Sequence, residues 1–264
     1  MRRAVKQAER KSAAQTEQQQ AEQQQAEQQR RTREVERAFQ LKAAFLEQLK
    51  ASGDPLIIDG GANLGQTSAR YLERLPQARI HAFEPFPESF ARLRERFQAE
   101  PGVTCHALGL DSESGRKTFY LNQHHGTHSL LPRPAGGKRY FMEGAGPMGE
   151  TELDFVSLDA FAPGFLASGE AIDLLKLDIQ GGELRALKGA RSLLSSGRIK
   201  MVYAEVQFVA LYQDAPLYHE VAAFLAGLGY GLLDLFNMER AADGQLRFAD
   251  GLFLSPEARR MLLG

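Results

Sequence analysis

Residues 56–65 read Leu-Ile-Ile-Asp-Gly-Gly-Ala-Asn-Leu-Gly, an apolar run that ends in an acidic residue and enters a turn of small residues. The apolar run predicts a buried strand. The glycines predict a tight turn, because glycine adopts positive φ and lets a ligand approach the backbone. An amphipathic helix is expected next, at about 66–75. Since ligands of open parallel sheets lie at the carboxyl ends of the strands, this turn is the first candidate for a binding site.

Apolar runs and amphipathic segments keep alternating along the rest of the chain. Further strands are expected at 78–84, 103–108, 152–157, 174–178, 201–206, 230–236 and 250–254, and further helices at 88–98, 182–194 and 217–228. Residues 111–151 are rich in Gly, Pro and His and are expected to form a long loop with one strand at 117–121. This alternation predicts an α/β fold with a mostly parallel sheet. The last two strands have a short connection, so they should form an antiparallel terminal hairpin.

The first fifty residues have a different composition. Residues 17–30 repeat Glu-Gln-Gln-Gln-Ala, and these good helix formers predict a solvated helix. Five residues advance about 500° around a helix, so Ala21 and Ala26 lie about 140° apart and build no coiled-coil seam. Apolar residues from Val35 onward allow the end of the helix to lie on the domain, and Ser52 and Gly53 should stop it. We expect a Gln-rich helical extension at 1–50, an exposed spacer or an arm for a protein partner or self-association, and the α/β domain at 51–264.

Composition excludes several classes of protein. The 264 residues carry a net charge of -1, so the whole chain is no obvious nucleic-acid binder. Cys105 is the only cysteine, which excludes an internal disulfide and a cysteine cluster for zinc. The sequence has no apolar stretch of about 18 residues, so no membrane span is expected. Nothing near Met1 resembles a signal peptide. The expected compartment is the cytoplasm.

The glycine turn distinguishes two adenosine cofactors. A dinucleotide fingerprint aligned on Gly60 and Gly65 would have Ala62 in place of its middle glycine, which counts against NAD. S-adenosylmethionine has no phosphate to bind, and Asp59 suits its cationic amino-acid part while turn amides suit its carboxylate. Glu84, at the end of the second strand, can accept hydrogen bonds from the ribose hydroxyls of either cofactor.

The chain resembles the FkbM family of methyltransferases. The matching segments are Asp59-Gly60-Gly61-Ala62-Asn63-Leu64-Gly65, Phe83-Glu84-Pro85, Val156-Ser157-Leu158-Asp159, Lys176-Leu177-Asp178-Ile179-Gln180-Gly181-Gly182-Glu183, Leu187-Lys188-Gly189-Ala190 and Ala204-Glu205-Val206. Gln180 stands where the family often has Glu, and Ser157 replaces the usual Thr. The resemblance covers about 55–236, and with the terminal hairpin it implies a Rossmann-like class I methyltransferase fold with a seven-stranded sheet.

The resemblance implies methyl transfer from S-adenosylmethionine to a hydroxyl of a sugar, glycan or secondary metabolite. A positioned base can remove the hydroxyl proton, and the candidates are Asp178, Glu205 and His125. Candidate cofactor-binding residues are Asp59, Gly61, Ala62, Asn63, Gly65, Glu84 and Ala107. Glu183 and Lys176 are as readily explained by a helix start and an ion pair.

Two other functions stay open. One is an NAD-dependent oxidoreductase on a similar sheet, and the other is a binding or scaffold protein that keeps the fold without catalysis. The His-rich segment at 122–129 is an exposed loop, a source of the base, or a site for a divalent ion. We expect no resident metal. The identity of the acceptor cannot be read from the sequence.

Overall fold

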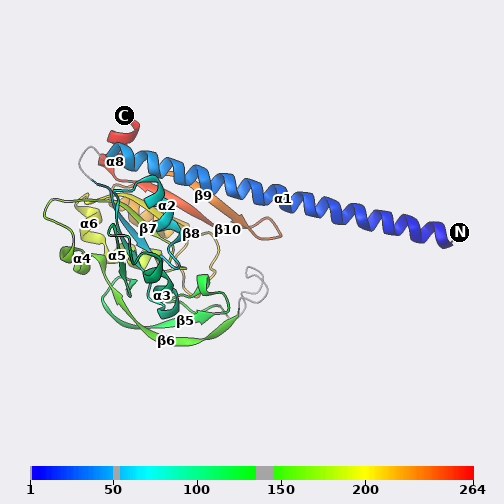
Figure 1. The fold of residues 1–264 in the computed structure, drawn as a ribbon, viewed down its shortest axis with the longest axis horizontal. Helices are drawn as coiled ribbons and strands as arrows, with labels where there is room; N and C mark the ends of the chain where they lie inside the picture. Colours follow the sequence, from blue (N-terminus) through cyan, green and yellow to red (C-terminus); the bar gives the residue numbers. More distant parts are fainter. Residues whose placement is uncertain (1, 50–53, 135–145) are drawn as a thin grey trace. The chain divides into compact units, whose positions relative to one another are not determined.

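The computed structural model describes residues 2–49, 54–134 and 146–264, and the expected helix stop at Ser52 and Gly53 lies outside them. The chain divides into two compact units, residues 1–42 and 43–264. One long helix, α1 (Arg2–Leu49), supplies the first unit and the first residues of the second (Figure 1). Within the described ranges, no helix is long and apolar enough to cross a membrane.

A seven-stranded sheet is the centre of the second unit (Figure 1). In spatial order its strands are β3 (Val103–His106), β2 (Arg79–Phe83), β1 (Leu56–Gly60), β7 (Ile172–Leu177), β8 (Ile199–Gln207), β10 (Leu246–Leu254) and β9 (Gly231–Arg240). β10 is antiparallel to both of its neighbours, and the other pairs are parallel. The mostly parallel sheet with an antiparallel terminal hairpin confirms the predicted class I methyltransferase fold.

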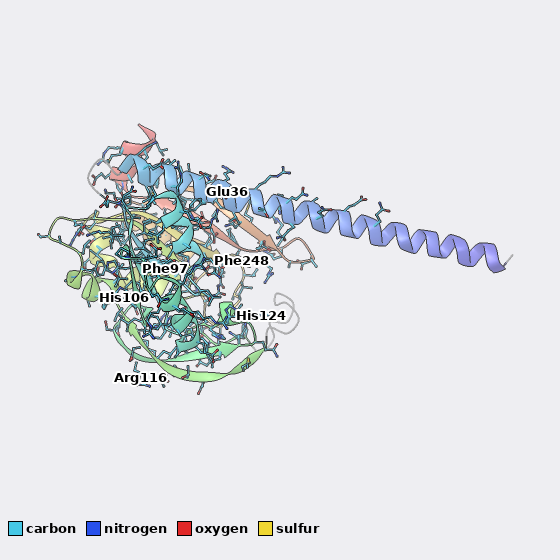
Figure 2. All side chains as sticks on the ribbon, in the orientation of Figure 1. Glu36, Phe97, His106, Arg116, His124 and Phe248 are labelled. Carbon is cyan, nitrogen blue, oxygen red and sulfur yellow. The ribbon has the colours of Figure 1, made fainter. Side chains whose placement is uncertain are left out.

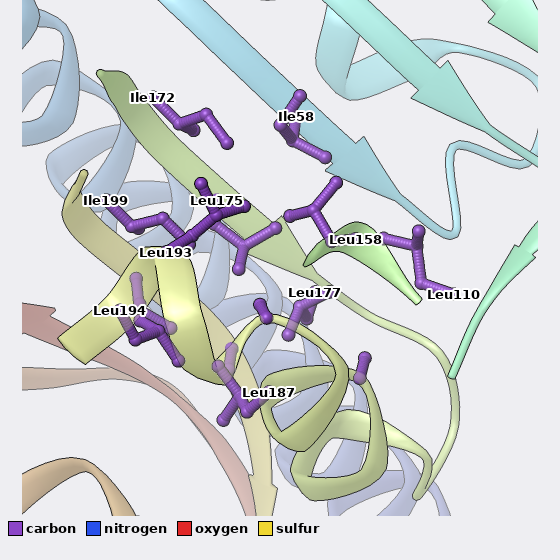
Figure 3. Packing of buried hydrophobic residues seen from close by; sticks show 14 of the residues in the cluster. Ile58, Leu110, Leu158, Ile172, Leu175, Leu177, Leu187, Leu193, Leu194 and Ile199 are labelled. Carbon is purple, nitrogen blue, oxygen red and sulfur yellow. The ribbon is translucent and has the colours of Figure 1, made fainter. Parts of the chain in front are cut away.

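One face of this sheet packs against four helices that follow β6. They are α4 (Leu158–Phe161), α5 (Glu183–Gly189), α6 (Arg191–Ser195) and α7 (Tyr218–Gly227), and a short 3₁₀ turn, η4 (Ala162–Gly164), continues α4. Alternate strand residues such as Ile58 and Leu175 meet Leu158, Leu187 and Leu193 in one buried cluster (Figure 3). Alternation is what a strand imposes, because successive side chains point to opposite faces.

The opposite face carries α2 (Gln66–Arg74) and α3 (Pro87–Arg96). Ser68 of α2 donates a hydrogen bond of 2.7 Å to the Asp59 carboxylate, which places α2 over this face. Leu93 and Phe97, at the end of α3, are buried against Ala82 of β2, the register partner of Asp59. α2, which follows the turn after β1, and α3, which follows β2, therefore pack on the same face of the sheet.

The expectation of a long loop at 111–151 is wrong where the segment is described. β4 (Gly109–Leu110), β5 (Gly115–Asn122) and β6 (Pro147–Val156) form a second, three-stranded sheet, and a 3₁₀ turn, η2 (His125–Thr127), follows β5. The strands expected at 117–121 and 152–157 are parts of β5 and β6, and only the polar, exposed first half of β6 was not expected to be a strand. Asp111 is fully buried and accepts two hydrogen bonds of 2.7 Å from Arg185 of α5, which joins this sheet to the domain.

The helix expected at 182–194 is divided into α5 and α6. A Cβ on Gly189 would lie 2.0 Å from the carbonyl oxygen of Asp111, so the backbones approach too closely for another residue. A last helix, α8 (Pro256–Leu263), was not expected. Ser255 caps it by accepting a hydrogen bond of 3.1 Å from the amide of Ala258.

Candidate active site

A cavity of about 380 Å³ opens at the carboxyl ends of β1, β2 and β7. Its wall includes Gly61, Ala62 and Asn63 from the turn after β1, Glu84 after β2 and Asp178 after β7. These strands are neighbours in the sheet, so segments far apart in the sequence meet at one edge. The size is that of a pocket for one small ligand.

The turn after β1 is fixed by its own amides. The amides of Gly61 and Ala62 donate to the carbonyl oxygen of Phe83 at 3.1 and 2.9 Å, and the amide of Asn63 donates to the Glu84 carboxylate at 2.9 Å. These three amides are therefore occupied within the protein and are not the donors expected for a ligand carboxylate. The turn offers a ligand close approach to its backbone instead.

Gly61 shows why the turn needs glycine. Its φ is +73°, in the left-handed region, and a Cβ at this position would lie 2.0 Å from the carbonyl oxygen of Asp178. The amide of Asp178 in turn donates to the carbonyl oxygen of Gly60 at 3.1 Å. The two ligand-facing turns, after β1 and after β7, are thus in direct backbone contact.

Glu84 presents a nearly buried carboxylate to the cavity. One oxygen accepts from the amide of Asn63 and the other from the amide of Phe86, both at 2.9 Å. Burial raises the pKa of Glu84, and these two hydrogen bonds oppose the rise without cancelling it. The side chain is fixed in direction, and its remaining lone pairs suit a pair of hydroxyl groups.

Asp59 lies beneath the turn instead of lining the cavity. It is fully buried, its carboxylate lies 3.0 Å from Nζ of Lys176, and Ser68 donates to it. Lys176 also donates to the carbonyl oxygens of Gly60 and Gly61, at 3.3 and 3.0 Å. Burial lowers the pKa of Lys176, but the carboxylates of Asp59 and Asp178 outweigh it and leave a net rise, so the charged ion pair supports the turn from below.

Gly65 and Ala107, two other predicted cofactor residues, do not reach the cavity wall either. A Cβ on Gly65 would lie 2.4 Å from the Phe97 ring, so this glycine serves the packing of α2 on α3. Ala107 is exposed in the bend after β3, while Gly109 and Leu110 just beyond it do line the cavity.

Three acidic residues, Asp178 just after β7, Glu183 at the start of α5 and Glu205 in β8, have different surroundings. Asp178 is exposed and lines the cavity. Burial raises the pKa of Glu183 to about 7, although its carboxylate accepts a hydrogen bond of 2.9 Å from the amide of Ile179. Glu205 is buried behind the cavity wall, and burial raises its pKa well above the ordinary value, with the Asp178 and Glu183 charges adding to the rise. Of the three, Asp178 is the carboxylate within reach of a ligand.

The histidine segment forms another part of the wall. His125 and His128 line the cavity, whereas His124 (labelled in Figure 2) does not. Nδ1 of His128 accepts from the amide of Asn122 at 3.0 Å, and burial lowers the pKa of this ring. His125 is exposed in η2. Among the described residues, no group of three or more His, Cys, Asp or Glu side chains is arranged to hold a metal ion.

An apolar surface that the sequence analysis did not foresee completes the cavity. Leu110, Phe119, Leu130 and Phe155 supply it, from β4, β5, the segment after η2 and β6. Leu110, Phe119 and Phe155 belong to the three strands of the second sheet. No motif marks them, because their proximity to the turn depends on how the second sheet folds back over the site.

The chain shares sequence with known methyltransferases. The profile of the methyltransferase FkbM domain matches residues 59–232. Methyltransferase sdnD of Sordaria araneosa is 31% identical over 156 residues, which cover 52% of this chain and 60% of sdnD. The 2-O-methyltransferase NoeI of Sinorhizobium fredii is 26% identical over 168 residues, 61% of this chain and 66% of NoeI.

A third relative is the hexuronic acid methyltransferase AglP of Haloferax volcanii, 28% identical over 162 residues, 60% of this chain and 58% of AglP. Each match therefore spans less than two thirds of the relative's own length. Among solved structures, fibrillarin of Aeropyrum pernix has a TM-score of 0.43 and 12% sequence identity, over 76% of this chain and 66% of fibrillarin.

Proposed function

This chain belongs to the FkbM methyltransferase family, which identifies S-adenosylmethionine as its methyl donor, and from that premise we propose that it transfers the methyl group to a hydroxyl oxygen of a sugar or a related small metabolite. The observation that carries the proposal is the exposed carboxylate of Asp178 in the same cavity as the cofactor turn and Glu84. The names of NoeI and AglP, a 2-O-methyltransferase and a hexuronic acid methyltransferase, favour a sugar as the acceptor.

The residues of the cavity fit the donor in three parts. Glu84 would accept hydrogen bonds from the ribose hydroxyls, and the apolar surface of Leu110, Phe119 and Phe155 would pack against the adenine. Oδ1 of Asn63 is buried and has no hydrogen-bond partner among the described residues, so it is a ready acceptor for the ammonium of the methionine part. An unsatisfied buried acceptor is costly, which makes a bound donor group at this position favourable.

Asp178 is the base in this proposal. When bound, S-adenosylmethionine supplies an electrophilic methyl group on a cationic sulfonium. Asp178 would orient the acceptor hydroxyl toward the bound donor, and its carboxylate would take the hydroxyl proton. His125 lines the same cavity and is the second candidate for this proton.

Calorimetry tests the donor first. Purified protein, cleared of copurified nucleotide, is titrated with S-adenosylmethionine and separately with NAD. We expect micromolar binding of S-adenosylmethionine and no response to NAD. Binding of NAD alone would overturn the proposal in favour of an oxidoreductase, and binding of neither would favour a scaffold.

Methyl transfer is then measured with isotopically labelled S-adenosylmethionine. The acceptors are methyl glycosides of neutral hexoses, 6-deoxyhexoses, hexuronic acids and 2-amino sugars, and the product is located by mass spectrometry and NMR. We expect a methyl ether on a ring hydroxyl. Methylation of only the 2-amino nitrogen would contradict oxygen as the target.

Two proposals remain for the rest of the protein. The Gln-rich helix α1 is a candidate site for self-association or a protein partner, which light scattering of the full chain and of a variant without residues 2–33 would test. The cytoplasm is the proposed compartment, which cell fractionation would test.

A further inference from the structure

Gln180 makes hydrogen bonds to three segments around the end of β7, where the acceptor is proposed to bind. Its Nε2 donates to the Asp178 carboxylate at 2.9 Å, and its Oε1 accepts from the hydroxyl of Tyr212 at 2.7 Å. Its backbone carbonyl accepts from the hydroxyl of Ser129 at 2.7 Å. With φ at +58°, Gln180 is also one of the few non-glycine residues in the left-handed region. One residue thus connects the end of β7, the segment after β8 and the histidine segment.

The direction of the Gln180 amide follows from its partners. A carboxylate accepts hydrogen bonds and cannot donate them, so the NH₂ group must face Asp178. The oxygen then faces Tyr212, whose hydroxyl also lies 3.0 Å from the carbonyl oxygen of Thr127. Tyr212 is buried at 1% exposure, and burial strongly raises its pKa, which keeps its hydroxyl a donor. The Arg133 guanidinium lies 4.8 Å from the centre of its ring.

Several charged or titratable groups surround Asp178. They are Lys176 on β7, Glu183 on α5, Tyr203 and Glu205 on β8, and Tyr212 after β8. The Lys176 ammonium is already committed to Asp59 and to two carbonyl oxygens. Gln180 is the group that gives Asp178 a direct side-chain hydrogen bond from the solvent side of the strand end.

We propose that Gln180 is a positioning residue that keeps Asp178 an oriented, acceptor-only carboxylate and fastens the segment 127–129 beside it. The proposal rests on the proposed function, in which Asp178 meets the acceptor hydroxyl. An amide is suited to this task because it donates to the carboxylate while accepting from Tyr212. The oxygen of Asp178 that Gln180 does not contact is left for the acceptor.

A glutamate at this position would behave differently in these surroundings. A carboxylate at 180 would lie at hydrogen-bond distance from the Asp178 carboxylate, and two such groups share one proton because like charges disfavour joint ionisation. Gln180 therefore keeps a second carboxyl group out of direct hydrogen-bond contact with Asp178.

The test uses the full chain with ¹³C-labelled Asp carboxyl groups, without any acceptor. The Asp178 resonance is assigned by its loss in Asp178→Asn, and its titration midpoint is measured in wild type, Gln180→Glu and Gln180→Met. We expect Gln180→Glu to raise the midpoint by about one pH unit or more, because a like charge is added. Gln180→Met should raise it less, since it removes only the hydrogen bond that favours the charged form.

Gln98→Glu is the matched control, because it places the same charge on an exposed residue just after α3 and should leave the Asp178 midpoint unchanged. An unchanged midpoint in Gln180→Glu would overturn the proposal. If that variant does not fold, an unchanged midpoint in Gln180→Met overturns it instead. Calorimetry with S-adenosylmethionine on the same samples reports separately on the proposed function, so the two failures are distinguishable.

Discussion

The two halves of the cavity, the donor side around the turn after β1 and the acceptor side around Asp178 and Gln180, are held in place by different kinds of contact. On the donor side, the turn after β1 is fixed by backbone amides of Gly61, Ala62 and Asn63 and by the buried Lys176 ammonium. On the acceptor side, side chains make the connections, and Gln180 is the residue through which most of them pass. Backbone contacts leave little freedom to substitution, whereas side-chain contacts can be exchanged without altering the sheet. The donor half is therefore the constant part of this site and the acceptor half the adjustable one.

The largest effect is expected when the donor half is broken at its tightest point. In Gly61→Ala a Cβ would lie 2.0 Å from the Asp178 carbonyl oxygen at a positive φ. We expect a loss of about 3 kcal/mol or more of unfolding free energy. Calorimetry should show S-adenosylmethionine affinity falling by at least about 100-fold, which is about 2.7 kcal/mol.

The control for this change is a glycine outside the cavity. In Gly164→Ala, at the end of η4, the new Cβ would meet no atom within 4 Å. We expect unchanged donor affinity and unfolding temperature. Equal damage from both substitutions would show that the loss in Gly61→Ala does not come from the tight turn.

Asp178→Asn tests the acceptor half without changing the donor half. An amide of the same shape cannot accept the hydroxyl proton, so kcat for the methyl glycoside found in the acceptor screen should fall by about 100-fold or more. Donor affinity should be unchanged, because Asp178 contacts the acceptor in this proposal. Asp154→Asn, on exposed β6, is the matched control. A fall in donor affinity with kcat intact would place Asp178 in the donor half.

A smaller effect is expected for Glu84→Gln. Each carboxylate oxygen of Glu84 accepts a backbone amide, so the NH₂ group of glutamine would face one of these donors and leave it unsatisfied. We expect calorimetry to show a loss of S-adenosylmethionine affinity of about 10-fold to 100-fold. Glu88→Gln, exposed at the start of α3, should have no effect. Unchanged affinity in Glu84→Gln would exclude this carboxylate as the ribose acceptor.

The smallest effect concerns acid stability of the donor half. Burial lowers the pKa of His81 on β2 to about 4, and its Nδ1 lies 3.0 Å from Nε2 of His106 (labelled in Figure 2). Because the folded-state pKa lies below the unfolded value of about 6.5, stability is full above that pH and is lost as the pH falls toward 4.

His81→Phe keeps a ring against Phe165, whose centroid lies 3.8 Å from that of His81, and removes the titration. Between pH 7 and pH 5, thermal unfolding should show this variant losing about 1 kcal/mol less than wild type, after discounting for the partial exposure of the ring. His219→Asn, exposed on α7, is the control and should follow wild type. Equal losses in wild type and His81→Phe would exclude His81 as the origin of the acid sensitivity.

The sequence predicted which residues form the donor half, but not the role of each one. The expected positions of Gly61, Ala62, Asn63 and Glu84 on one cavity are met, because a glycine turn and a strand end are local features. The role expected of Asp59 is not supported by its position, since its carboxylate lies under the turn with Lys176. Sequence spacing places a residue at a strand end, but which face its side chain occupies depends on the register of neighbouring strands.

The acceptor half was harder to predict. Of the three residues predicted as a base, Asp178 and His125 line the cavity, whereas Glu205 is buried and does not. The apolar surface of Phe119 and Phe155 gave no signal. Strands were expected at 117–121 and 152–157, but neither pattern indicated that the two would pair in a second sheet beside the turn. Contacts between segments separated by many residues carry no local pattern.

The sequence by itself determined the family, the order of the strands in the large sheet along the chain, the antiparallel hairpin and the glycine turn, all of which follow from local propensity, periodicity and motif. Only the tertiary structure decided that Asp59 supports the turn, that Gln180 joins Asp178 to Tyr212 and Ser129, and that a second sheet covers the site. The physical reason is that hydrogen bonds and burial are properties of pairs of segments, and pairing becomes defined only when the chain has closed on itself.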